Sequence, residues 1–227
     1  MKPIVILMLK AVIFDWDGTL AETREAVIQS FQTVLTDAGC KVSDEFIVRL
    51  MGVGTKKTII EAFKTCNKRL NVSILEELTN KKVEIQVKNT KKVKLMAGAF
   101  ELLQELYGKT KIALATMSGR QVIDKLLKEK NIKKYFDVVI TANDVSKPKP
   151  DPEVFIVSAS KLGIDTQKCL VIEDSVFGLR AAKIAKMKCI GIPSGAYSKE
   201  ELTKEKPQLL IDSLVERKKI LDFIYNN

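Results

Sequence analysis

The chain of 227 residues contains no histidine. This absence excludes every Ser-His and Cys-His nucleophile scheme, and it also excludes an imidazole general base. Any catalysis must therefore depend on carboxylates, lysines, hydroxyl groups or a bound metal ion.

Cysteine is scarce, and its spacing excludes the common metal-binding patterns. Cys40, Cys66, Cys169 and Cys189 are far apart in the sequence and form no CxxC pair. Without histidine, a zinc site would require these scattered thiols to meet at one point. We therefore expect all four to be buried free thiols.

No apolar run is long enough to cross a membrane. The longest one, Ile4–Leu9 continued by Ala11–Phe14, is interrupted by Lys10. It falls short of the ~20 residues that a bilayer-spanning helix needs. It also lacks the small-residue cleavage site of a secretory signal. These features predict a cytoplasmic protein without a membrane partner.

Aromatic residues are few (6%), and the positive charge is concentrated in one segment. Between Lys41 and Leu95, 13 lysines and arginines stand against 6 acidic residues, so this segment carries +7 of the net +10. Such a balance fits nucleic acid, an anionic surface, an anionic small substrate or a solvated lysine-rich exterior. Because the aromatics are not interleaved with the basic residues, a base-stacking platform is disfavoured. We expect no nucleic-acid partner, and a monomer or weak dimer.

The pattern of apolar residues divides the chain into two parts. Lys10–Trp16 is an apolar run that ends in acid and glycine, as expected of a buried strand leading into a loop. Residues 21–94 contain no convincing strand and predict an all-helical insertion. The expected helices are Glu22–Ala38, closed by Gly39, then Ser43–Met51, Thr55–Leu70 and Ser73–Lys91, the last with Ser73 and Glu76 at capping-box spacing.

From Gly98 onward, strands alternate with helices. Strands rich in valine, isoleucine and leucine, separated by helices, indicate a parallel sheet covered on both faces. The sequence thus predicts an α/β, doubly wound, Rossmann-like core of residues 1–20 and 95–227, with a helical cap of residues 21–94. The expected strands are Lys111–Thr116, Asp137–Thr141, Lys168–Ile172, Lys188–Ile192 and Leu209–Ile211, and the expected helices are Arg120–Lys130, Asp151–Leu162, Val176–Ala185 and Asp212–Ile224.

Polar side chains follow several of these strands. In parallel sheets of this kind, ligands bind outside the carboxyl ends of the strands. We therefore expect the polar loops to meet at one edge. Those loops hold Asp15, Asp17, Gly18 and Thr19 after the first strand, Thr116, Ser118 and Gly119 after the second, Lys147 after the third, and Glu173 and Asp174 after the fourth.

Four carboxylates at one edge would repel one another unless a cation lay between them. Oxygen-only ligands select Mg²⁺, which also keeps a place for a substrate phosphate oxygen. Lys147 would add a fixed positive charge, and Thr116 could donate a hydrogen bond to a phosphate oxygen. Backbone N–H groups around Gly18 and Gly119, next to helix starts, also suit an anion.

Asp15 and Asp17 lie on either side of a residue that points into the core, so both can face one pocket. One can attack phosphorus while the other protonates the leaving oxygen and later deprotonates water. The arrangement predicts metal-assisted phosphoryl transfer. Taken singly, DxDG is a common turn, and Glu173-Asp174 could be acids that stabilise a helix start. It is their joint placement on one sheet that favours a catalytic site.

These motifs together resemble the haloacid dehalogenase-like (HAD) hydrolases, in the subgroup with a helical cap after the first strand. The residues that carry this resemblance are DWDGTL (Asp15–Leu20), Thr116, Lys147 within KPKPDPEVF, and VIEDSVFGLRAA (Val171–Ala182). The resemblance implies that Asp15 forms an aspartyl-phosphate and binds Mg²⁺, and that Asp17 is the acid/base and a metal ligand through its carbonyl. It also implies that Glu173 and Asp174 complete the metal site, directly or through water.

The same motifs distinguish the subclasses of the family. Dehalogenases lack the second aspartate and use no Mg²⁺, so Asp17 argues against that chemistry. The similar β-phosphoglucomutases carry a cap histidine about twelve residues beyond the nucleophile, where this chain has Val27. We therefore predict a phosphatase of a small phosphorylated metabolite, such as a sugar phosphate or phosphoglycolate, with a sugar phosphomutase as the alternative.

The cap is expected to determine specificity by closing over the site. Lys82 resembles a cap lysine that sugar-phosphate members direct at the substrate, and Arg24 and Lys56 are weaker candidates. The chain also departs from its relatives at Ala97-Gly98, where Pro-Gly is frequent, and at Lys186, where glycine is frequent. Arg24 stands where members of the family often have an acidic or polar residue, so the resemblance does not identify the substrate.

Overall fold

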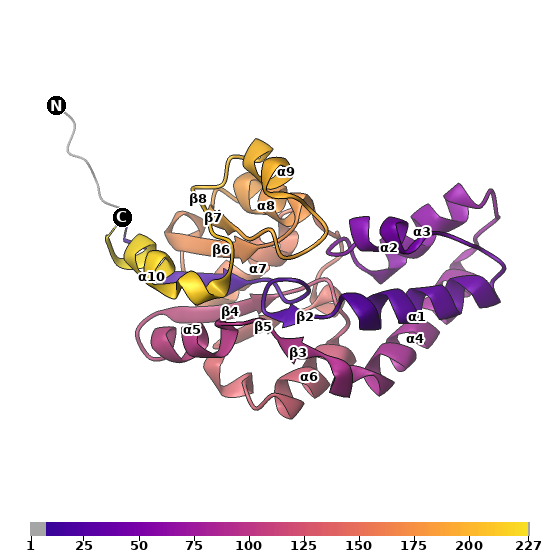
Figure 1. The fold of residues 1–227 in the computed structure, drawn as a ribbon, viewed down its shortest axis with the longest axis horizontal. Coiled ribbons are helices and arrows are strands. Elements are labelled where there is room, and N and C mark those ends of the chain that lie inside the picture. Colours follow the sequence, from indigo (N-terminus) through magenta and orange to yellow (C-terminus); the bar gives the residue numbers. More distant parts are fainter. Residues whose placement is uncertain (1–7, 227) are drawn as a thin grey trace.

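The computed structural model describes residues 8–226, so positions 4–7 of the apolar N-terminal run lie outside it. A six-stranded parallel sheet forms its centre, in the order β5-β4-β1-β6-β7-β8 (Figure 1). The strands are β1 (Ala11–Phe14), β4 (Lys111–Ala115), β5 (Val138–Ile140), β6 (Cys169–Glu173), β7 (Lys188–Gly191) and β8 (Leu209–Leu210).

Helices cover both faces of this sheet. Successive side chains of a strand point to opposite sides, and apolar ones therefore need cover on both faces. Val12 and Phe14 of β1 belong to one buried cluster, while Ala11 and Ile13 belong to the other. The first cluster is completed by α5 (Ala99–Leu106), α6 (Arg120–Glu129) and α10 (Arg217–Asn226), and the second by α7 (Glu153–Leu162), α8 (Val176–Ile184) and α9 (Lys199–Lys204). The predicted α/β class with a doubly wound parallel sheet is confirmed.

A separate group of helices follows β1 and forms a cap with its own apolar core. Buried residues of this core include Val34, Leu35, Ile47 and Ile59. The chain enters the cap through β2 (Ala21–Glu22) and leaves it through β3 (Lys94–Leu95), and these two strands pair antiparallel. The cap helices are α1 (Arg24–Asp37), α2 (Asp44–Arg49), α3 (Thr55–Thr65) and α4 (Val72–Lys88).

Some element boundaries differ from the sequence-based predictions. The predicted capping box at Ser73 is wrong: α4 begins earlier, because the Asn71 side chain accepts a hydrogen bond from the backbone N–H of Ile74 at 2.8 Å. Gly39 does close α1, in a left-handed conformation with φ of 67°. Helix α5 begins directly after Ala97-Gly98, α9 was not predicted, and short 3-10 turns occupy Thr90–Lys92, Lys133–Tyr135, Ala142–Asp144, Thr166–Lys168 and Leu214–Glu216.

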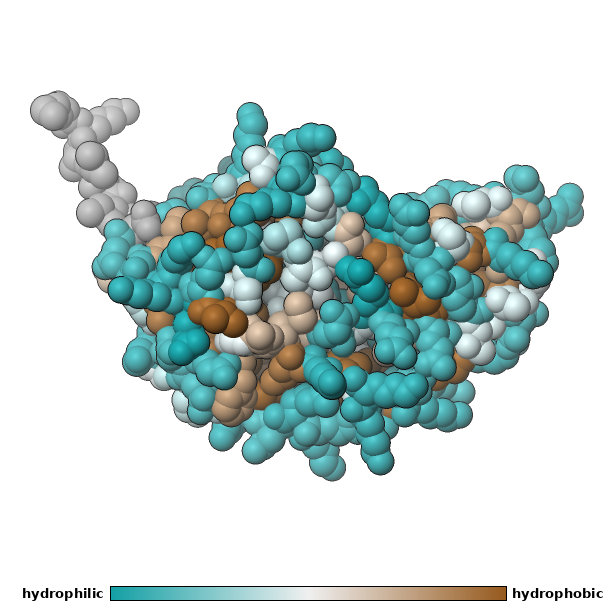
Figure 2. Space-filling model, in the orientation of Figure 1, coloured by the Kyte–Doolittle hydropathy of each residue, from teal (hydrophilic) through white to brown (hydrophobic). Residues whose placement is uncertain are grey.

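Within residues 8–226, no helix is long and apolar enough to cross a membrane. Hydrophilic side chains cover most of the face of the molecule shown in Figure 2.

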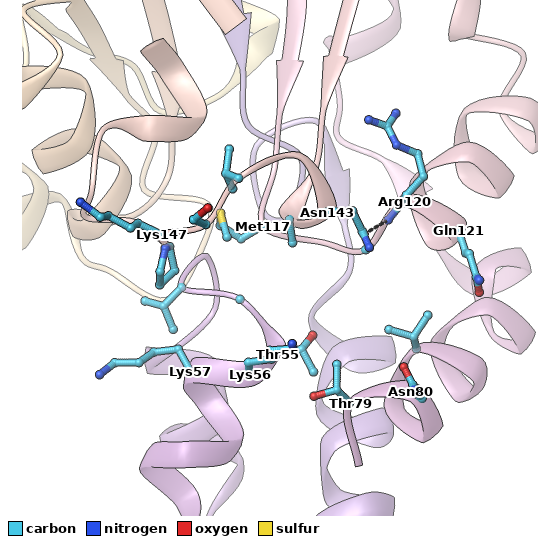
Figure 3. A pocket seen from close by; sticks show the side chains of 18 of the residues that line it. Thr55, Lys56, Lys57, Thr79, Asn80, Met117, Arg120, Gln121, Asn143 and Lys147 are labelled. Atoms are coloured by element: carbon cyan, nitrogen blue, oxygen red, sulfur yellow. Dashed lines mark hydrogen bonds between the residues drawn. The ribbon is translucent and has the colours of Figure 1, made fainter. Parts of the chain in front are cut away.

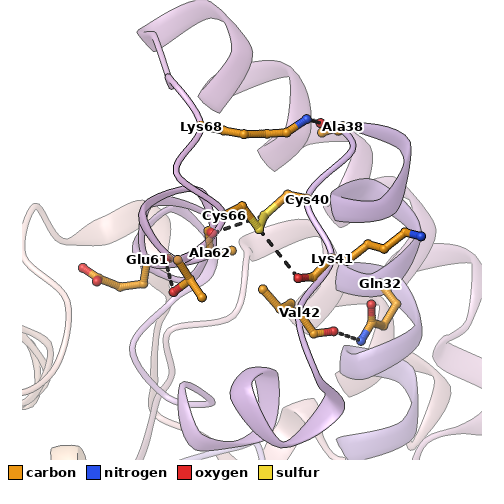
Figure 4. Close-up of a disulfide and its surroundings, with 10 residues drawn as sticks. Gln32, Ala38, Cys40, Lys41, Val42, Glu61, Ala62, Cys66 and Lys68 are labelled. Atoms are coloured by element: carbon orange, nitrogen blue, oxygen red, sulfur yellow. Dashed lines mark hydrogen bonds between the residues drawn. A yellow bond between two sulfur atoms is a disulfide. The ribbon is translucent and has the colours of Figure 1, made fainter.

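Two of the four cysteines are joined, so the prediction of four free thiols is wrong for them. A disulfide connects Cys40, just after α1, to Cys66 at the end of α3 (Figure 4). Both helices end at the same end of the cap, which the sequence spacing alone could not show. Cys169 and Cys189 are free and buried, as predicted.

Reducing this disulfide should destabilise the cap. The bond closes a loop between residues 26 positions apart, so its loss is expected to cost about 3 kcal/mol through the greater chain entropy of the unfolded state. Urea unfolding followed with and without reductant would measure this cost. A Cys40→Ala/Cys66→Ala variant should behave like the reduced protein and should not respond to reductant; equal midpoints for oxidised and reduced wild type would contradict the expectation.

Candidate active site

The carboxyl ends of β1 and β6 bring Asp15 and Glu173 to one buried lysine, Lys149. The Lys149 ammonium donates to Asp15 Oδ1 at 2.7 Å, to Glu173 Oε1 at 2.6 Å and to the Ala115 carbonyl at 3.3 Å. Its side chain is fully buried, and the Phe155 ring lies 4.8 Å away. Burial alone would lower the pKa of Lys149, but the adjacent Asp15 and Glu173 carboxylates raise it above its usual value. Lys149 is therefore a permanent positive charge beside Asp15.

The prediction that Lys147 stands beside the nucleophile is wrong. The Lys147 side chain is 72% exposed, and its nearest acidic partner is Asp151 at 3.8 Å. The two lysines of KPKP are two residues apart, so their side chains would point to the same side if the segment were regularly extended. Here the segment bends before Pro150, and Lys149 alone enters the sheet edge.

Asp174 is held tightly by two glycines and one hydroxyl group. Thr19 donates to Asp174 Oδ1 at 3.2 Å. A Cβ atom on Gly18 or Gly195 would lie 2.3 or 1.7 Å from Asp174 Oδ2, so a side chain at either position would displace the carboxylate. Gly18 also has a φ of 85°. Thr19, predicted to bind substrate, is thus engaged in positioning a carboxylate.

Asp17 is bound by hydroxyl groups from both the core and the start of the cap. Ser118 donates to Asp17 Oδ2 at 2.7 Å, and Thr23 donates to Oδ1 at 2.7 Å. The Thr116 hydroxyl lies 3.5 Å from Asp17 Oδ2 and accepts a hydrogen bond from the Ser118 backbone N–H at 3.0 Å. Thr23 was not singled out in the sequence, although it immediately precedes α1. It links Asp17 to the hinge of the cap.

Three carboxylates meet at this edge in an arrangement that can hold a metal ion. Asp15, Glu173 and Asp174 each offer an oxygen within 4.8 Å of the others. Burial, reinforced by neighbouring carboxylates, raises the pKa of both Asp15 and Asp174 well above the usual value, while Lys149 opposes the rise. A divalent cation fits such a group of carboxylate oxygens, because its charge offsets their negative charge.

Glu173 differs from the other two carboxylates because both of its oxygens already accept hydrogen bonds. Oε1 accepts from Lys149, while Oε2 accepts from the backbone N–H groups of Asp174 and Ser175 at 3.0 and 2.9 Å. The Ser175 hydroxyl also donates to Oε2 at 2.9 Å. Glu173 thus fixes Lys149 and the start of α8, whereas Asp15 keeps one oxygen that accepts no hydrogen bond from the described residues.

A small cavity of about 30 Å³ lies beside Asp17, between the core and the cap. Val27 and Lys82 of the cap line it together with Ser118 of the core. Lys82 is buried; its ammonium donates to Gln86 Oε1 at 2.5 Å and lies 4.6 Å from the centre of the Phe31 ring. Burial lowers the pKa of Lys82 to about 8, although Asp17 opposes this shift.

A much larger cleft of about 830 Å³ adjoins this cavity (Figure 3). Both spaces are lined by Gly54, Thr55 and Met117. Lys56 and Lys57 at the start of α3 line the cleft from the cap side, and most of its other charged residues are also basic. Thr79 contributes a buried hydroxyl oxygen that has no hydrogen-bond partner among residues 8–226. The core side is formed by Gly119, Arg120, Gln121, Asn143 and Lys147.

The other predicted residues are distributed around these spaces. Gly119 precedes α6 and lies close to Val83 of α4, where a Cβ atom would be 3.5 Å from a Val83 methyl group. Arg24 does not reach either cavity; it donates to the Gly195 carbonyl at 2.6 Å. Lys56 is exposed in the large cleft and has no acidic partner within 4.0 Å among the residues described.

Comparison with known proteins agrees with the fold and the site. Residues 12–192 match the model of the haloacid dehalogenase-like hydrolases, and the chain belongs to this family. A phosphorylated carbohydrates phosphatase of Thermotoga maritima is 30% identical over 78% of this chain and 82% of its own length. A hydrolase from Pseudomonas syringae has a similar structure, with a TM-score of 0.87 at 25% identity over 95% of this chain and 99% of that one.

The fold is shared with mutases as well as phosphatases. A β-phosphoglucomutase from Clostridium difficile gives a TM-score of 0.86 at 24% identity, covering 96% of this chain and 98% of that one. At this identity the likeness shows the fold alone. The predicted family is confirmed, and so is the prediction of a HAD-like phosphatase, through the family match and relatives named as phosphatases.

Proposed function

We propose that this protein is a Mg²⁺-dependent phosphatase that hydrolyses a small phosphorylated metabolite through an aspartyl-phosphate on Asp15. The observation that carries this proposal is the buried contact of Asp15 with Lys149, next to Asp174 and two residues before Asp17. Lys149 neutralises one oxygen of Asp15 and leaves the other for attack on phosphorus. The positive charge also stabilises the negative charge that spreads over the transferring phosphoryl group.

Asp17 is proposed as the general acid and base. It would protonate the leaving oxygen of the substrate and then deprotonate the water that hydrolyses the aspartyl-phosphate. Ser118 and Thr23 hold its carboxylate toward the cavity that Lys82 also lines. Thr116, Ser118 and the backbone N–H group of Gly119 are proposed to bind phosphate oxygens, whereas the predicted N–H of Gly18 already donates to the Ala21 carbonyl at 2.9 Å.

The metal would be held by Asp15, Asp174 and the carbonyl of Asp17, with Glu173 acting through water. This division follows from the hydrogen bonds of Glu173, whose two oxygens are both engaged. A divalent ion there would neutralise the clustered carboxylates and the substrate phosphate. An all-oxygen ligand set favours Mg²⁺ over softer metals.

Residues 21–94 are proposed as the specificity domain, with boundaries at the paired strands β2 and β3. The small cavity beside Asp17 suits only the reacting phosphate and the atoms next to it. The remainder of the leaving group would extend along Gly54 and Met117, which line both spaces, into the larger basic cleft. A sugar phosphate or another hydroxylated or anionic phosphate ester matches its polar lining.

A phosphomutase is the second candidate, since the fold is shared with a β-phosphoglucomutase. The position where that subclass carries its cap histidine is occupied by Val27, which lines the small cavity and cannot transfer a proton. Phosphate release from a panel of phosphorylated metabolites, with and without Mg²⁺, tests both functions. Release of inorganic phosphate without any bisphosphate supports the phosphatase; isomerisation of a sugar 1-phosphate that depends on a bisphosphate supports the mutase.

The pH dependence of substrate binding should report the charge of Lys82. The pKa of Lys82 is about 8, so its ammonium is present below this pH and is lost above it. An anionic substrate binds the charged form better, and kcat/KM should therefore fall above about pH 8. In Lys82→Arg, which stays protonated, the fall should disappear, whereas Lys82→Met should give a low, pH-independent kcat/KM; identical profiles for all three would contradict a role for Lys82.

A further inference from the structure

The loop of residues 193–198, between β7 and α9, contacts the proposed metal site on one side. The Ser194 hydroxyl donates to the Gly18 carbonyl at 2.6 Å. Gly195 lies directly against Asp174, where a Cβ atom would overlap the carboxylate. A displacement of this loop would therefore move Asp174 and the backbone that follows Asp17.

The opposite side of the 193–198 loop is bound to the cap through Arg49, at the end of α2. The Arg49 guanidinium forms a two-pronged ion pair with Glu201, at 2.7 and 3.1 Å, and donates to the Ala196 carbonyl at 3.3 Å. It also lies 4.4 Å from the centre of the Tyr197 ring. Such a planar, bidentate and stacked contact is more specific than an ordinary surface ion pair.

Tyr197 completes the contact in the other direction. Its hydroxyl donates to the backbone carbonyl of Arg49 at 2.7 Å. Burial raises the pKa of Tyr197 to about 12, so this hydroxyl keeps its proton at neutral pH. Arg24, at the hinge of the cap, adds a second link through the Gly195 carbonyl. Arg24 and Arg49 of the cap thus both form hydrogen bonds with the 193–198 loop, which packs on Asp174.

We propose that Arg49 is a positioning residue that couples closure of the cap to the geometry of the metal site through the 193–198 loop. The proposal rests on the proposed function, because it takes Asp15 and Asp174 as metal ligands. With the cap closed, Arg49 holds the loop so that Gly195 and Ser194 fix Asp174 and the Gly18 carbonyl. With the cap open, the loop loses these restraints and the ligands lose their alignment.

Linkage makes this coupling reciprocal: if closure strengthens metal binding, the metal must favour closure by the same factor. Loss of Arg49 should therefore weaken Mg²⁺ binding even though Arg49 touches none of the proposed ligands. We expect the dissociation constant to rise about tenfold in Arg49→Met, within the usual range of coupling between sites. Activity lost at low Mg²⁺ should return at saturating Mg²⁺, which would not occur in Asp17→Asn.

The test is a calorimetric Mg²⁺ titration of the full chain, repeated by fluorescence. Trp16, the single tryptophan, is buried between Asp15 and Asp17 and provides the fluorescence signal. Tyr197→Phe, which removes one hydroxyl group, gives a second and milder disruption in case Arg49→Met folds poorly. Arg217→Met is the matched control, because Arg217 forms a similarly exposed ion pair with Glu105, at 2.7 Å and away from the cap.

Weaker Mg²⁺ binding in Arg49→Met and Tyr197→Phe, with Arg217→Met unchanged, supports the coupling. Small-angle X-ray scattering should at the same time show a more open Arg49→Met protein. An open protein with unchanged Mg²⁺ affinity would overturn the coupling, as would equal affinities in all variants. A wild type that binds Mg²⁺ but hydrolyses no phosphate ester would overturn the proposed function alone, and a wild type that binds no Mg²⁺ would overturn both.

Discussion

Replacing Lys149 by methionine is expected to abolish phosphatase activity and to destabilise the fold. The change leaves the buried carboxylates of Asp15 and Glu173 without their shared cation. Removing one partner of a buried ion pair typically costs about 3–5 kcal/mol. Activity should fall by at least about a thousandfold, since the fixed charge beside the transferring phosphoryl group is lost. Urea unfolding and phosphate release measure the two effects.

Lys147→Met provides the matched control for this prediction. It removes the other lysine of the same KPKP segment, whose side chain is largely exposed. Stability should change by no more than about 0.5 kcal/mol, as is usual for surface substitutions. If Lys149→Met is poorly folded, the variant Lys149→Met/Glu173→Gln should recover stability by removing one unpaired carboxylate without recovering activity. Equal losses in the two single lysine variants would contradict the assignment of Lys149.

Asp15→Asn is expected to eliminate turnover while leaving the protein folded. The amide is nearly isosteric and can still accept a hydrogen bond from Lys149, but it cannot attack phosphorus. Activity should fall by at least about ten-thousandfold, as for the loss of other catalytic nucleophiles. Without metal, thermal stability should be unchanged or higher, because one of several repelling buried carboxylates is removed.

Phosphate release and thermal unfolding of the purified variant check both parts of this prediction. Asp165→Asn is a suitable control, because the Asp165 side chain is 78% exposed and remote from the sheet edge. That variant should retain full activity. Retention of more than about 1% of activity by Asp15→Asn, in a preparation free of other phosphatases, would contradict nucleophilic catalysis by Asp15.

The sequence predicted that carboxylates would meet at one sheet edge because the rule that locates them is geometric, and the structure brings Asp15, Glu173 and Asp174 together there. Asp15, Asp17, Glu173 and Asp174 all follow apolar runs, and parallel strands bring such positions to one edge. The sheet and its two helical layers were predicted for the same reason, since strand and helix periodicities differ clearly. Lys82 was placed by resemblance, and the structure does put it beside Asp17.

The errors concern side chains whose position depends on irregular backbone or on tertiary contacts. Lys147 and Lys149 each precede a proline in the same segment, so the sequence does not distinguish them. The bend of their loop leaves the Lys147 side chain exposed and buries that of Lys149. The Cys40–Cys66 bond depends on how α1 and α3 pack, which spacing does not encode. No local motif marks Thr23, Gly195 or Arg49, because only the fold brings their contact partners close to them.

The antiparallel pairing of β2 with β3 places the outgoing and returning crossings of the cap side by side, with Ala21 opposite Leu95. The inserted segment can therefore lengthen, shorten or be exchanged without changing the spacing of β1 and β4 beneath it. A graft of a foreign cap between these two crossings should change which esters are accepted, and it should also weaken Mg²⁺ binding unless the new cap supplies the contacts that Arg49 makes with the 193–198 loop. In this architecture the carboxylates belong to the core, while the cap carries both the proposed specificity residues and the contacts that hold the 193–198 loop.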